Sequence, residues 1–432
     1  MMLNRRQLIG GAAAGATASL AGCAGLTGRT PSQEAPEQTT LTFVNWSGDA
    51  EKAAFDALIA AFTAANPDVV VRTDTVPYAS IQTNIDSRFQ AGTPPDLFRV
   101  SYIDIGQYTS QGVLLDVSGT FTAERAAQFV PGLYQGVVAD GRPYGVPHQI
   151  DTSAVLYRTD AFEAAGIRDV PASLEEAWSW EEFAAVAERL AGVTKGKQVP
   201  FIYNWQAAGA YRWLSWLFQA DGRLLTEDLL APAVDSPQGR RTLEFTRSFY
   251  TEGWVARNSS TKSTTYAGDE FVAGAAAMAF VGDFVLPAVD AGVDFEYRVL
   301  PMPRDVRAAS DLGGNAIVAA AEGAHTEAAL RFLDFIAQEE PMRTYCEATG
   351  QLPTLTSLTQ TELDFEVRPD LMGTFVEQAT TITPEQVAQV TVPAFARINT
   401  LLGNELETMF LQGREAGATA QALDEALAQA LR

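Results

Sequence analysis

Histidine and cysteine are nearly missing from this chain of 432 residues, which has two of each. The cysteines, Cys23 and Cys346, are too few for a disulfide framework or a zinc-thiolate cluster. His148 and His325 are far apart, and neither an HExxH motif nor an EF-hand loop occurs. The chain also lacks a G-x-S-x-G nucleophile elbow. We therefore expect no cofactor, no metal and no catalytic constellation.

Basic residues are scarce. Lys and Arg together number 30 against 53 Asp and Glu, which gives a formal net charge of −23. Nucleic acids are bound through Lys/Arg patches that contact phosphates, and anionic lipid surfaces attract similar clusters. The composition argues against both partners. A cationic ligand stays compatible with the charge, although net charge mainly reports solubility.

The chain has no long hydrophobic run. A membrane-spanning helix needs roughly 18 or more apolar residues, and no segment reaches that length. The weakly apolar residues 9–20 follow Arg5-Arg6 and end at Leu20-Ala21-Gly22-Cys23. A charged start, a short apolar middle and small residues at the end are typical of an export signal.

Two parts of this segment resemble known export motifs. Arg5-Arg6 resembles a twin-arginine signal, and Leu20-Ala21-Gly22-Cys23 resembles a bacterial lipobox. We expect residues 1–23 to be a signal peptide and Cys23 to be lipidated. The protein would be exported and held on the outer surface of the cell membrane by lipid alone. The alternatives are an ordinary cleaved signal or a disordered Ala/Gly-rich tail.

The following residues predict a tether and then an α/β fold. Residues 24–40 are rich in Gly, Pro, Ser, Thr and Gln, which is typical of a disordered linker. Strands are expected at residues 41–46, 69–75 and 97–101, alternating with helices, one of them at residues 80–91. This strand–helix rhythm is typical of an α/β domain with a mostly parallel sheet.

Local motifs predict several later element boundaries. Asp140-Gly141 indicates a type I′ hairpin. Ser179 and Glu182 form a capping-box pattern, and Ser236-Pro237 has the pattern of a second helix start. Helices are also expected at residues 326–337 and 390–432, and the Trp-rich residues 213–218 at helical spacing belong in the core.

The order of short motifs resembles the family 1 extracellular solute-binding proteins of ABC transporters, the maltose-binding-like class. The opening strand and helix are similar to the first βα unit of that family. The further motifs are Pro95-Asp96-Leu97-Phe98, Gly112-Val113-Leu114-Leu115-Asp116, Pro143-Tyr144-Gly145-Val146-Pro147, Leu156-Tyr157-Arg158, Ser179-Trp180-Glu181-Glu182-Phe183, Phe271-Val272-Ala273-Gly274 with Ala277-Met278 and Gly282-Asp283-Phe284, Leu300-Pro301-Met302-Pro303, Gly313-Gly314-Asn315 and Gly350-Gln351-Leu352-Pro353. The resemblance covers nearly all of residues 41–432. Phe284 departs from a tryptophan usual in the family, and Arg158 from an asparagine.

The resemblance implies a two-lobe periplasmic-binding-protein-like α/β fold with a ligand cleft between the lobes. Lobe 1 would comprise residues 41–149 plus 305–342, and lobe 2 residues 150–304 plus 343–432. Chain crossings would lie near residues 149–152, 300–304 and 341–345. In such proteins the ligand sits between the lobes, which close around it by hinge bending.

Candidate ligand residues follow strand ends or lie at the expected crossings, where ligands meet open α/β sheets. They are Trp46, Ser47, Asp49, Tyr102, Asp104, His148, Gln149, Asp151, Trp205, Gln206, Asp283, Phe284, Gly314 and Asn315. Aromatic rings stack on sugar CH faces, and carboxylates or amides bond hydroxyls. For several of these residues a structural role explains the sequence as well as ligand binding does. Ser47 and Asp49 could cap a helix, Trp46 could pack within the fold, and His148 could lie in the core.

The sequence therefore predicts a monomeric binding protein of an ABC importer that delivers a mono- or oligosaccharide to its permease without covalent chemistry. A glycerol phosphodiester or a polyamine is the alternative ligand, and a phosphate would call for an arginine such as Arg99 in the cleft. Outside the binding class, the rival is a glycan-processing enzyme. Glycoside hydrolysis needs a pair of carboxylates, and a chain with 53 of them can always supply such a pair.

Overall fold

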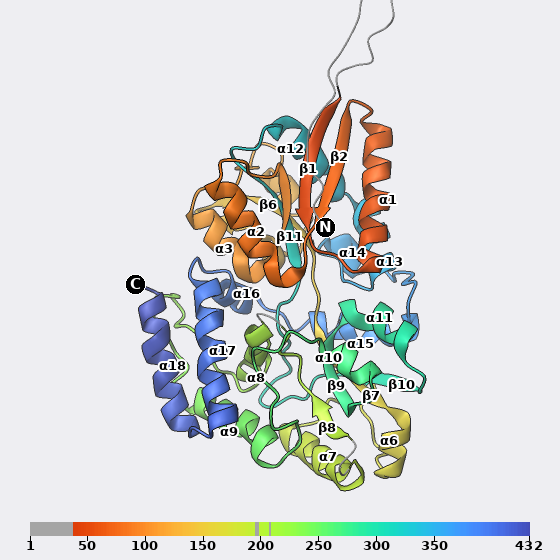
Figure 1. The fold of residues 1–432 in the computed structure, drawn as a ribbon, viewed down its shortest axis with the longest axis vertical. Coiled ribbons are helices and arrows are strands. Elements are labelled where there is room, and N and C mark those ends of the chain that lie inside the picture. Colours follow the sequence, from red (N-terminus) through yellow and green to blue (C-terminus); the bar gives the residue numbers. More distant parts are fainter. Residues whose placement is uncertain (1–37, 195–197, 207–208) are drawn as a thin grey trace, which may run out of the picture. The chain divides into compact units, whose positions relative to one another are not determined.

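The computed structural model describes residues 38–194, 198–206 and 209–432. The predicted signal peptide, Cys23 and all but three residues of the predicted tether lie outside the described residues. Within them the predicted α/β class is confirmed: the chain forms two separate sheets with helices around each (Figure 1).

The first sheet has the strand order β2-β1-β3-β11-β6. Its strands are β1 (Thr39–Asn45), β2 (Val69–Thr75), β3 (Leu97–Ser101), β6 (Gly145–Gln149) and β11 (Asn315–Ala319). β1 runs parallel to β2 and β3, whereas β11 runs antiparallel to both β3 and β6. Four of the five strands therefore run in one direction, as the predicted mostly parallel sheet requires, and β11 is the exception. Asn315, the first residue of β11, lies beside Ser101, the last residue of β3, so the chain enters β11 at the edge where β3 ends.

The second sheet has the order β10-β7-β9-β8. Its strands are β7 (Ser153–Arg158), β8 (Val199–Ile202), β9 (Ala276–Gly282) and β10 (Tyr297–Leu300). β9 is buried along its whole length and pairs antiparallel with β7 and parallel with β8. A small hairpin, β4 (Val138–Ala139) and β5 (Arg142–Pro143), lies apart from both sheets. Asp140 and Gly141 have φ of 49° and 75°, so the predicted type I′ turn is confirmed.

Amphipathic helices cover the first sheet. They are α1 (Asp49–Ala65), α2 (Tyr78–Gln90), α3 (Tyr102–Ser110), α12 (Thr326–Ile336) and α13 (Glu339–Thr349), with the short α4 (Ala123–Ala126), α5 (Pro131–Gln135) and α14 (Thr356–Thr359) nearby. α1 buries Phe55, Leu58 and Phe62, as the apolar spacing predicts. Cys346 on α13 is fully buried and packs as a small core residue.

The second sheet packs against an aromatic core. Its helices are α6 (Thr159–Ala164), α7 (Trp180–Val193), α8 (Leu214–Gln219), α9 (Pro237–Thr251), α10 (Ala267–Val272) and α11 (Leu286–Gly292), with 3₁₀ turns at Gly209–Trp213 and Asp283–Val285. Trp180 stacks on Phe245 with ring centroids 4.3 Å apart, and Trp216 lies beside both. The predicted caps are confirmed: Ser179 accepts from the amide of Glu182, and Ser236 from that of Gly239.

The C-terminal helices pack on both halves of the described chain. They are α15 (Pro369–Ala379), α16 (Pro384–Val390), α17 (Phe395–Gln412) and α18 (Ala416–Ala430). The segment predicted as helical, 390–432, holds two helices because Gly413 takes the left-handed conformation between them, with φ of 77°. α17 contacts α3 beside the first sheet and α9 beside the second.

Three chain segments join the two sheets. Residues 150–152 lead from β6 to β7, residues 301–314 lead from β10 to β11, and the chain returns after α13. Ile150 in the first segment bridges to Leu352, which lies between α13 and α14. The boundary predicted after residue 342 falls inside α13, which packs on α1 through residue pairs along both helices. We propose that the third crossing lies later, between α14 and α15.

Candidate functional site

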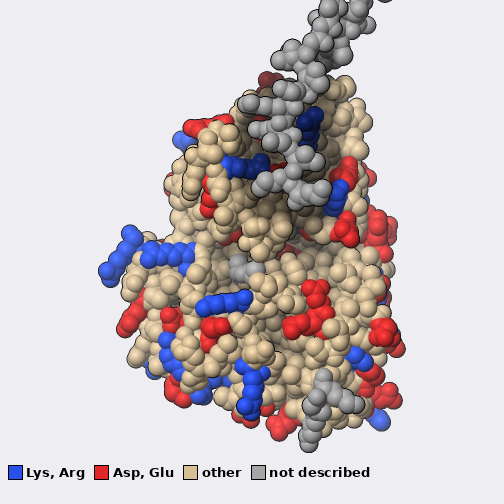
Figure 2. Space-filling model, in the orientation of Figure 1, with Lys and Arg blue, Asp and Glu red and all other residues tan. Residues whose placement is uncertain are grey.

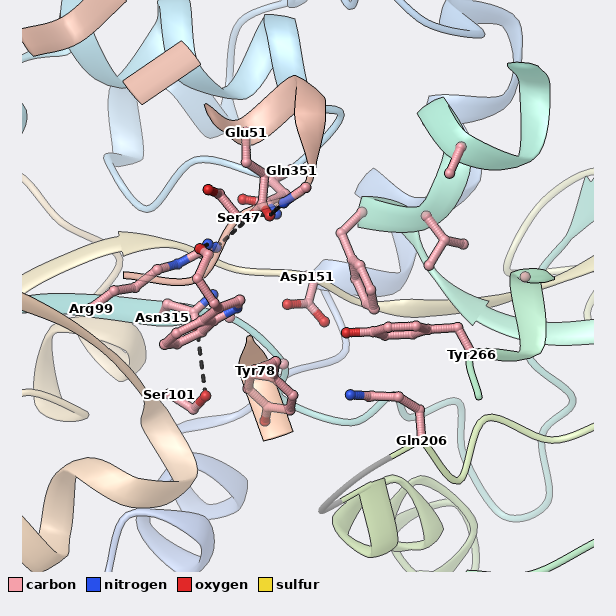
Figure 3. Close-up of a pocket in the computed structure, with 18 of the residues that line it drawn as sticks. Ser47, Glu51, Tyr78, Arg99, Ser101, Asp151, Gln206, Tyr266, Asn315 and Gln351 are labelled. Carbon is pink, nitrogen blue, oxygen red and sulfur yellow. Dashed lines mark hydrogen bonds and ion pairs between the residues drawn. The ribbon is translucent and has the colours of Figure 1, made fainter. Parts of the chain in front are cut away.

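A cavity of about 630 Å³, here called the central cavity, is lined by residues from both sheets and from the crossings between them (Figure 3). The first-sheet side contributes Trp46, Ser47, Gly48, Glu51, Thr75, Val76, Pro77, Tyr78, Arg99, Ser101, Ile103 and Asn315; the second-sheet side Gln206, Tyr211, Arg212, Tyr266, Gly268, Asp269, Val272, Phe284, Val285, Ala288 and Val289; the crossings Asp151, Leu312, Gly313, Gly314 and Gln351. Its position is therefore that of a cleft between two lobes.

Aromatic rings lie on both sides of the central cavity. Trp46 follows β1 and Tyr78 begins α2, and their ring centroids are 5.2 Å apart. Facing them, Tyr266 precedes α10 and packs edge-on against Phe284 at 5.8 Å. Each ring offers a wide apolar face with few rotatable bonds to fix. The cavity can thus hold the flat apolar side of a ligand between two aromatic walls.

A buried ion pair fixes the wall beneath Trp46. The Arg99 guanidinium, 1 % exposed, donates to Glu51 Oε1 at 2.6 Å and to the carbonyl oxygen of Trp46 at 2.7 Å. It also lies 4.5 Å from the Trp46 ring centroid. Gln351 donates to the same Glu51 oxygen at 2.8 Å. Burial alone would raise the pKa of Glu51, but Arg99 outweighs it and leaves that pKa lowered.

Asp151 lies in the first crossing and points into the central cavity (Figure 3). Its carboxyl group presses against the backbone of Gly313, where an added Cβ would lie 1.9 Å from Asp151 Oδ1. A side chain at residue 313 would therefore displace the Asp151 carboxyl group. Burial raises the pKa of Asp151 to about 7, Arg212 opposes the rise, and Asp311 adds to it.

Two further carboxyl groups lie behind Asp151. Asp283, fully buried, accepts from the Thr152 amide at 3.3 Å, and its Oδ1 has no hydrogen-bond partner among the described residues. Its pKa is raised by burial first and by Asp151 second. Asp311 lies 3.8 Å from Arg212, whose guanidinium covers the Tyr211 ring at 4.7 Å.

Half of the residues predicted from the sequence line the central cavity. These are Trp46, Ser47, Asp151, Gln206, Phe284, Gly314 and Asn315. Gly314 has φ of 106° and lies against the backbone of residues 149–150, which fits the predicted close-approach turn.

The other predicted residues lie outside the lining. Asp49 starts α1 with its side chain exposed. Tyr102 and Asp104 lie on α3, and burial, followed by repulsion from Asp86, raises the pKa of Asp104 to about 7. Gln149 is buried in β6, Trp205 packs against Phe410, and Asp283 lies one layer behind Asp151.

His148 has the structural role that the sequence left open. It is fully buried between the rings of Phe55 and Tyr345, with centroids 5.7 and 4.4 Å away. Burial, assisted by the charge of Arg99, lowers the pKa of His148 to about 3, so the imidazole is neutral near pH 7.

Sequence reasoning missed several lining residues, among them Tyr78, Tyr211, Arg212, Tyr266 and Gln351. One had a usable signal: Tyr78 follows the end of β2, as Trp46 follows the end of β1. Tyr266 and Arg212 come from irregular segments between elements, and only the three-dimensional arrangement brings them to the cavity.

Metal-binding clusters and membrane-spanning helices are both absent from the described residues. No group of three or more His, Cys, Asp or Glu side chains in this part of the chain is arranged to hold a metal ion. No helix within the described ranges combines the length and apolar character of a membrane span. On the face in Figure 2, the basic side chains of the described residues are spread among acidic and uncharged ones.

The two sheets, their crossings and the cavity between them define the class of two-lobed binding proteins. The chain belongs to the bacterial extracellular solute-binding protein family, whose model matches residues 45–343. An ABC transporter extracellular-binding protein of Pyrococcus horikoshii is 25% identical over 328 residues, which cover 71% of this chain and 70% of that protein.

Solved structures share the fold. An ABC substrate-binding protein of Listeria monocytogenes in complex with cycloalternan aligns with a TM-score of 0.78 and 22% identity, covering 90% of this chain and 98% of that one. UgpB of Mycobacterium tuberculosis in complex with glycerophosphocholine aligns with a TM-score of 0.75 and 20% identity, covering 90% and 97%. The two-lobe periplasmic-binding fold predicted from the motifs is thereby confirmed. The chain is an extracellular solute-binding protein of the ABC transporter class, and several of the solved structures that share its fold are complexes with sugars.

Proposed function

We propose that the protein captures a mono- or oligosaccharide in the central cavity and delivers it to the permease of an ABC importer. The observation that carries this proposal is the pairing of aromatic walls, Trp46 with Tyr78 and Tyr266 with Phe284, around hydrogen-bonding groups. Sugars present apolar CH faces to such rings and hydroxyls to amides and carboxyls. The sugar complexes among the structural neighbours support the same ligand class.

Capture would close the two lobes about the crossings. The first lobe would comprise residues 41–149 and 305–342, extended through the ends of α13 and α14. The second lobe would comprise residues 150–304 and the rest of the C-terminal segment. A ligand must favour the closed form by about 5.5 kcal/mol to move a 1:99 equilibrium to 99:1. A ligand that contacts the rings on both sides of the cavity has such a preference, because only the closed form makes both sets of contacts.

The place of action is also a proposal. Arg5-Arg6 and Leu20-Ala21-Gly22-Cys23 would export the chain and anchor it outside the membrane through lipid on Cys23. Residues 24–40 would tether the binding domain, as a monomer, at high effective concentration near its permease.

A second ligand class has one specific observation in its favour. Arg99 and Arg212 both line the central cavity, and a glycerol phosphodiester would need such cations. Arg99 is already bonded to Glu51 and to the Trp46 carbonyl group, which leaves Arg212 as the cation in reach of a phosphate. The glycerophosphocholine complex of a structural neighbour supports this alternative.

A thermal-shift screen tests the proposal. The purified protein is heated with mono- and disaccharides, glycerophosphocholine and spermidine in separate wells. We expect a sugar to raise the melting temperature, since a ligand at 100 times its Kd stabilises by about 2.7 kcal/mol. A shift with a non-sugar solute and none with any sugar would reject the carbohydrate proposal, and turnover of an oligosaccharide would reject a pure binder.

A further inference from the structure

In and behind the central cavity, buried acidic groups outnumber basic ones. The charged groups that act on Asp151 are Arg99, Arg212, Glu51, Asp311 and Asp283. With Asp151 itself this makes four acids against two bases, and the acids other than Glu51 are at most 7 % exposed. Buried charges are normally paired, because leaving one unpaired in a dry site is costly.

Both cations are already engaged by other carboxylates. Arg99 has Glu51 at 2.6 Å, and Arg212 has Asp311 at 3.8 Å. Within the described part of the chain, the Asp151 carboxyl group accepts no side-chain or backbone hydrogen bond and has no cation at ion-pair distance, although Arg212 and Arg99 attract it from farther away. Asp151 is thus a buried acid with a free face turned to the cavity (Figure 3).

The surroundings of Asp151 are aromatic. Tyr211, Tyr266, Phe284, Trp46 and Tyr78 line the same cavity, and Figure 3 shows Tyr266 directed toward Asp151. The faces of aromatic rings attract cations, and recognition of ammonium groups commonly combines such rings with a carboxylate. Burial raises the pKa of the Tyr211 and Tyr266 hydroxyls, which are therefore neutral near pH 7 and add no negative charge.

We propose that the central cavity takes a ligand with an ammonium group, and that Asp151 is its counter-ion. This inference rests on the proposed function, because it names the chemical class of the solute that enters the same cavity. On a sugar scaffold the class is an amino sugar, in which a protonated amine replaces one hydroxyl group with little change of size.

The pH dependence of binding has opposite signs for the two kinds of ligand. An ammonium group favours the ionised form of Asp151, so binding releases a proton and affinity rises as the pH rises through about 7. A neutral sugar that accepts a hydrogen bond from protonated Asp151 favours the acid form, and its affinity falls over the same interval.

Three disaccharides with the same linkage separate the effect of the ligand's charge on affinity from the effect of its shape. Cellobiose carries hydroxyls, the β-1,4 disaccharide of glucosamine carries amines, and its N,N′-diacetyl form carries neutral amides. Calorimetry on the full chain at pH 7 should find the diamine bound at least about tenfold more tightly than either neutral disaccharide. Glycerophosphocholine, whose permanent ammonium group does not titrate, is the fourth probe. The series from pH 6 to pH 8 is measured with it and with cellobiose, because the amines of the glucosamine disaccharide lose their own protons in this interval.

The variant Asp151→Asn removes the charge and keeps the shape. We expect it to lose the preference for the ammonium probe by about the same tenfold factor and to lose the pH dependence. Asp56→Asn on the exposed face of α1 is the matched control, because Asp56 only pairs with Lys52 at the surface. It should leave affinity unchanged. Melting temperatures of both variants show whether they fold.

Each outcome decides between the two proposals. Cellobiose bound as tightly as the diamine would overturn the ammonium inference and leave the carbohydrate function standing. Glycerophosphocholine bound with no saccharide bound would reject the carbohydrate function and support the inference. A glycerophosphocholine affinity that falls with rising pH, or no binding of either ammonium probe, overturns the inference.

Discussion

At the scale of the residue, neighbouring side chains decide what each candidate does. Trp46 and His148 are both aromatic residues beside a strand end in the sequence. Trp46 reaches the central cavity over Arg99, whereas His148 is enclosed by Phe55 and Tyr345. Their surroundings, and not their residue types, separate a ligand contact from a core residue.

Trp46→Ala should weaken ligand binding more than it lowers stability. The ring is only partly buried, so its loss removes ligand contact while the core beneath it stays packed. We expect affinity to fall by about tenfold or more, as for an aromatic residue at the centre of a binding site. Calorimetry and urea unfolding measure the two effects. Tyr144→Ala, a half-buried aromatic residue outside the lining, is the control, and equal affinity would remove Trp46 from the site.

At the scale of the element, short-range signals were reliable. The capping box at Ser179 and the Asp140-Gly141 hairpin both occur as predicted. Each depends on residues within a few positions, whose hydrogen bonds and φ preferences the local sequence fixes.

Ser179→Ala should destabilise the protein by about 1 kcal/mol, because the amide of Glu182 loses its acceptor at the start of α7. Chemical unfolding measures the change. Ser87→Ala on the exposed face of α2 is a serine-to-alanine control without a cap and should change the unfolding free energy by much less. A loss no larger than in the control would show that the cap adds nothing.

Long-range pairing was the part that sequence could not supply. The direction in which β11 runs is set by its pairing with β3, more than 200 residues earlier in the chain. No local sequence pattern encodes whether this pairing is parallel or antiparallel. The same holds for the cavity: Tyr266 and Arg212 join it from segments between elements, while Tyr102 and Asp104, at an apparent strand edge, point elsewhere.

At the scale of the whole molecule, the crossings concentrate buried acid. Asp283 accepts from Thr152 in the first crossing, and Asp151 lies against Gly313 in the second. Raised pKa values mean that the folded chain binds more protons than the unfolded chain from about pH 4 upward to the folded pKa. These groups therefore lower stability as the pH rises through that window.

Asp283→Asn should reduce this pH dependence. The amide oxygen still accepts from Thr152, but no charge has to be buried, so we expect the variant to be more stable than the wild type at pH 8, by about 2 kcal/mol or more, and similar at about pH 4. Urea unfolding at the two pH values measures the difference. A variant less stable than the wild type at pH 8 would contradict the raised pKa.

The ion pair of Arg99 has a consequence for the thermodynamics of capture. Glu51, Gln351 and the Trp46 carbonyl group hold the guanidinium in place, so the wall that bears Trp46 is ordered before any solute arrives. Immobilising a flexible side chain on binding costs about 0.5–1.5 kcal/mol of conformational entropy. The wall that bears Trp46 therefore avoids this cost when a solute is captured, and more of the contact free energy remains for affinity.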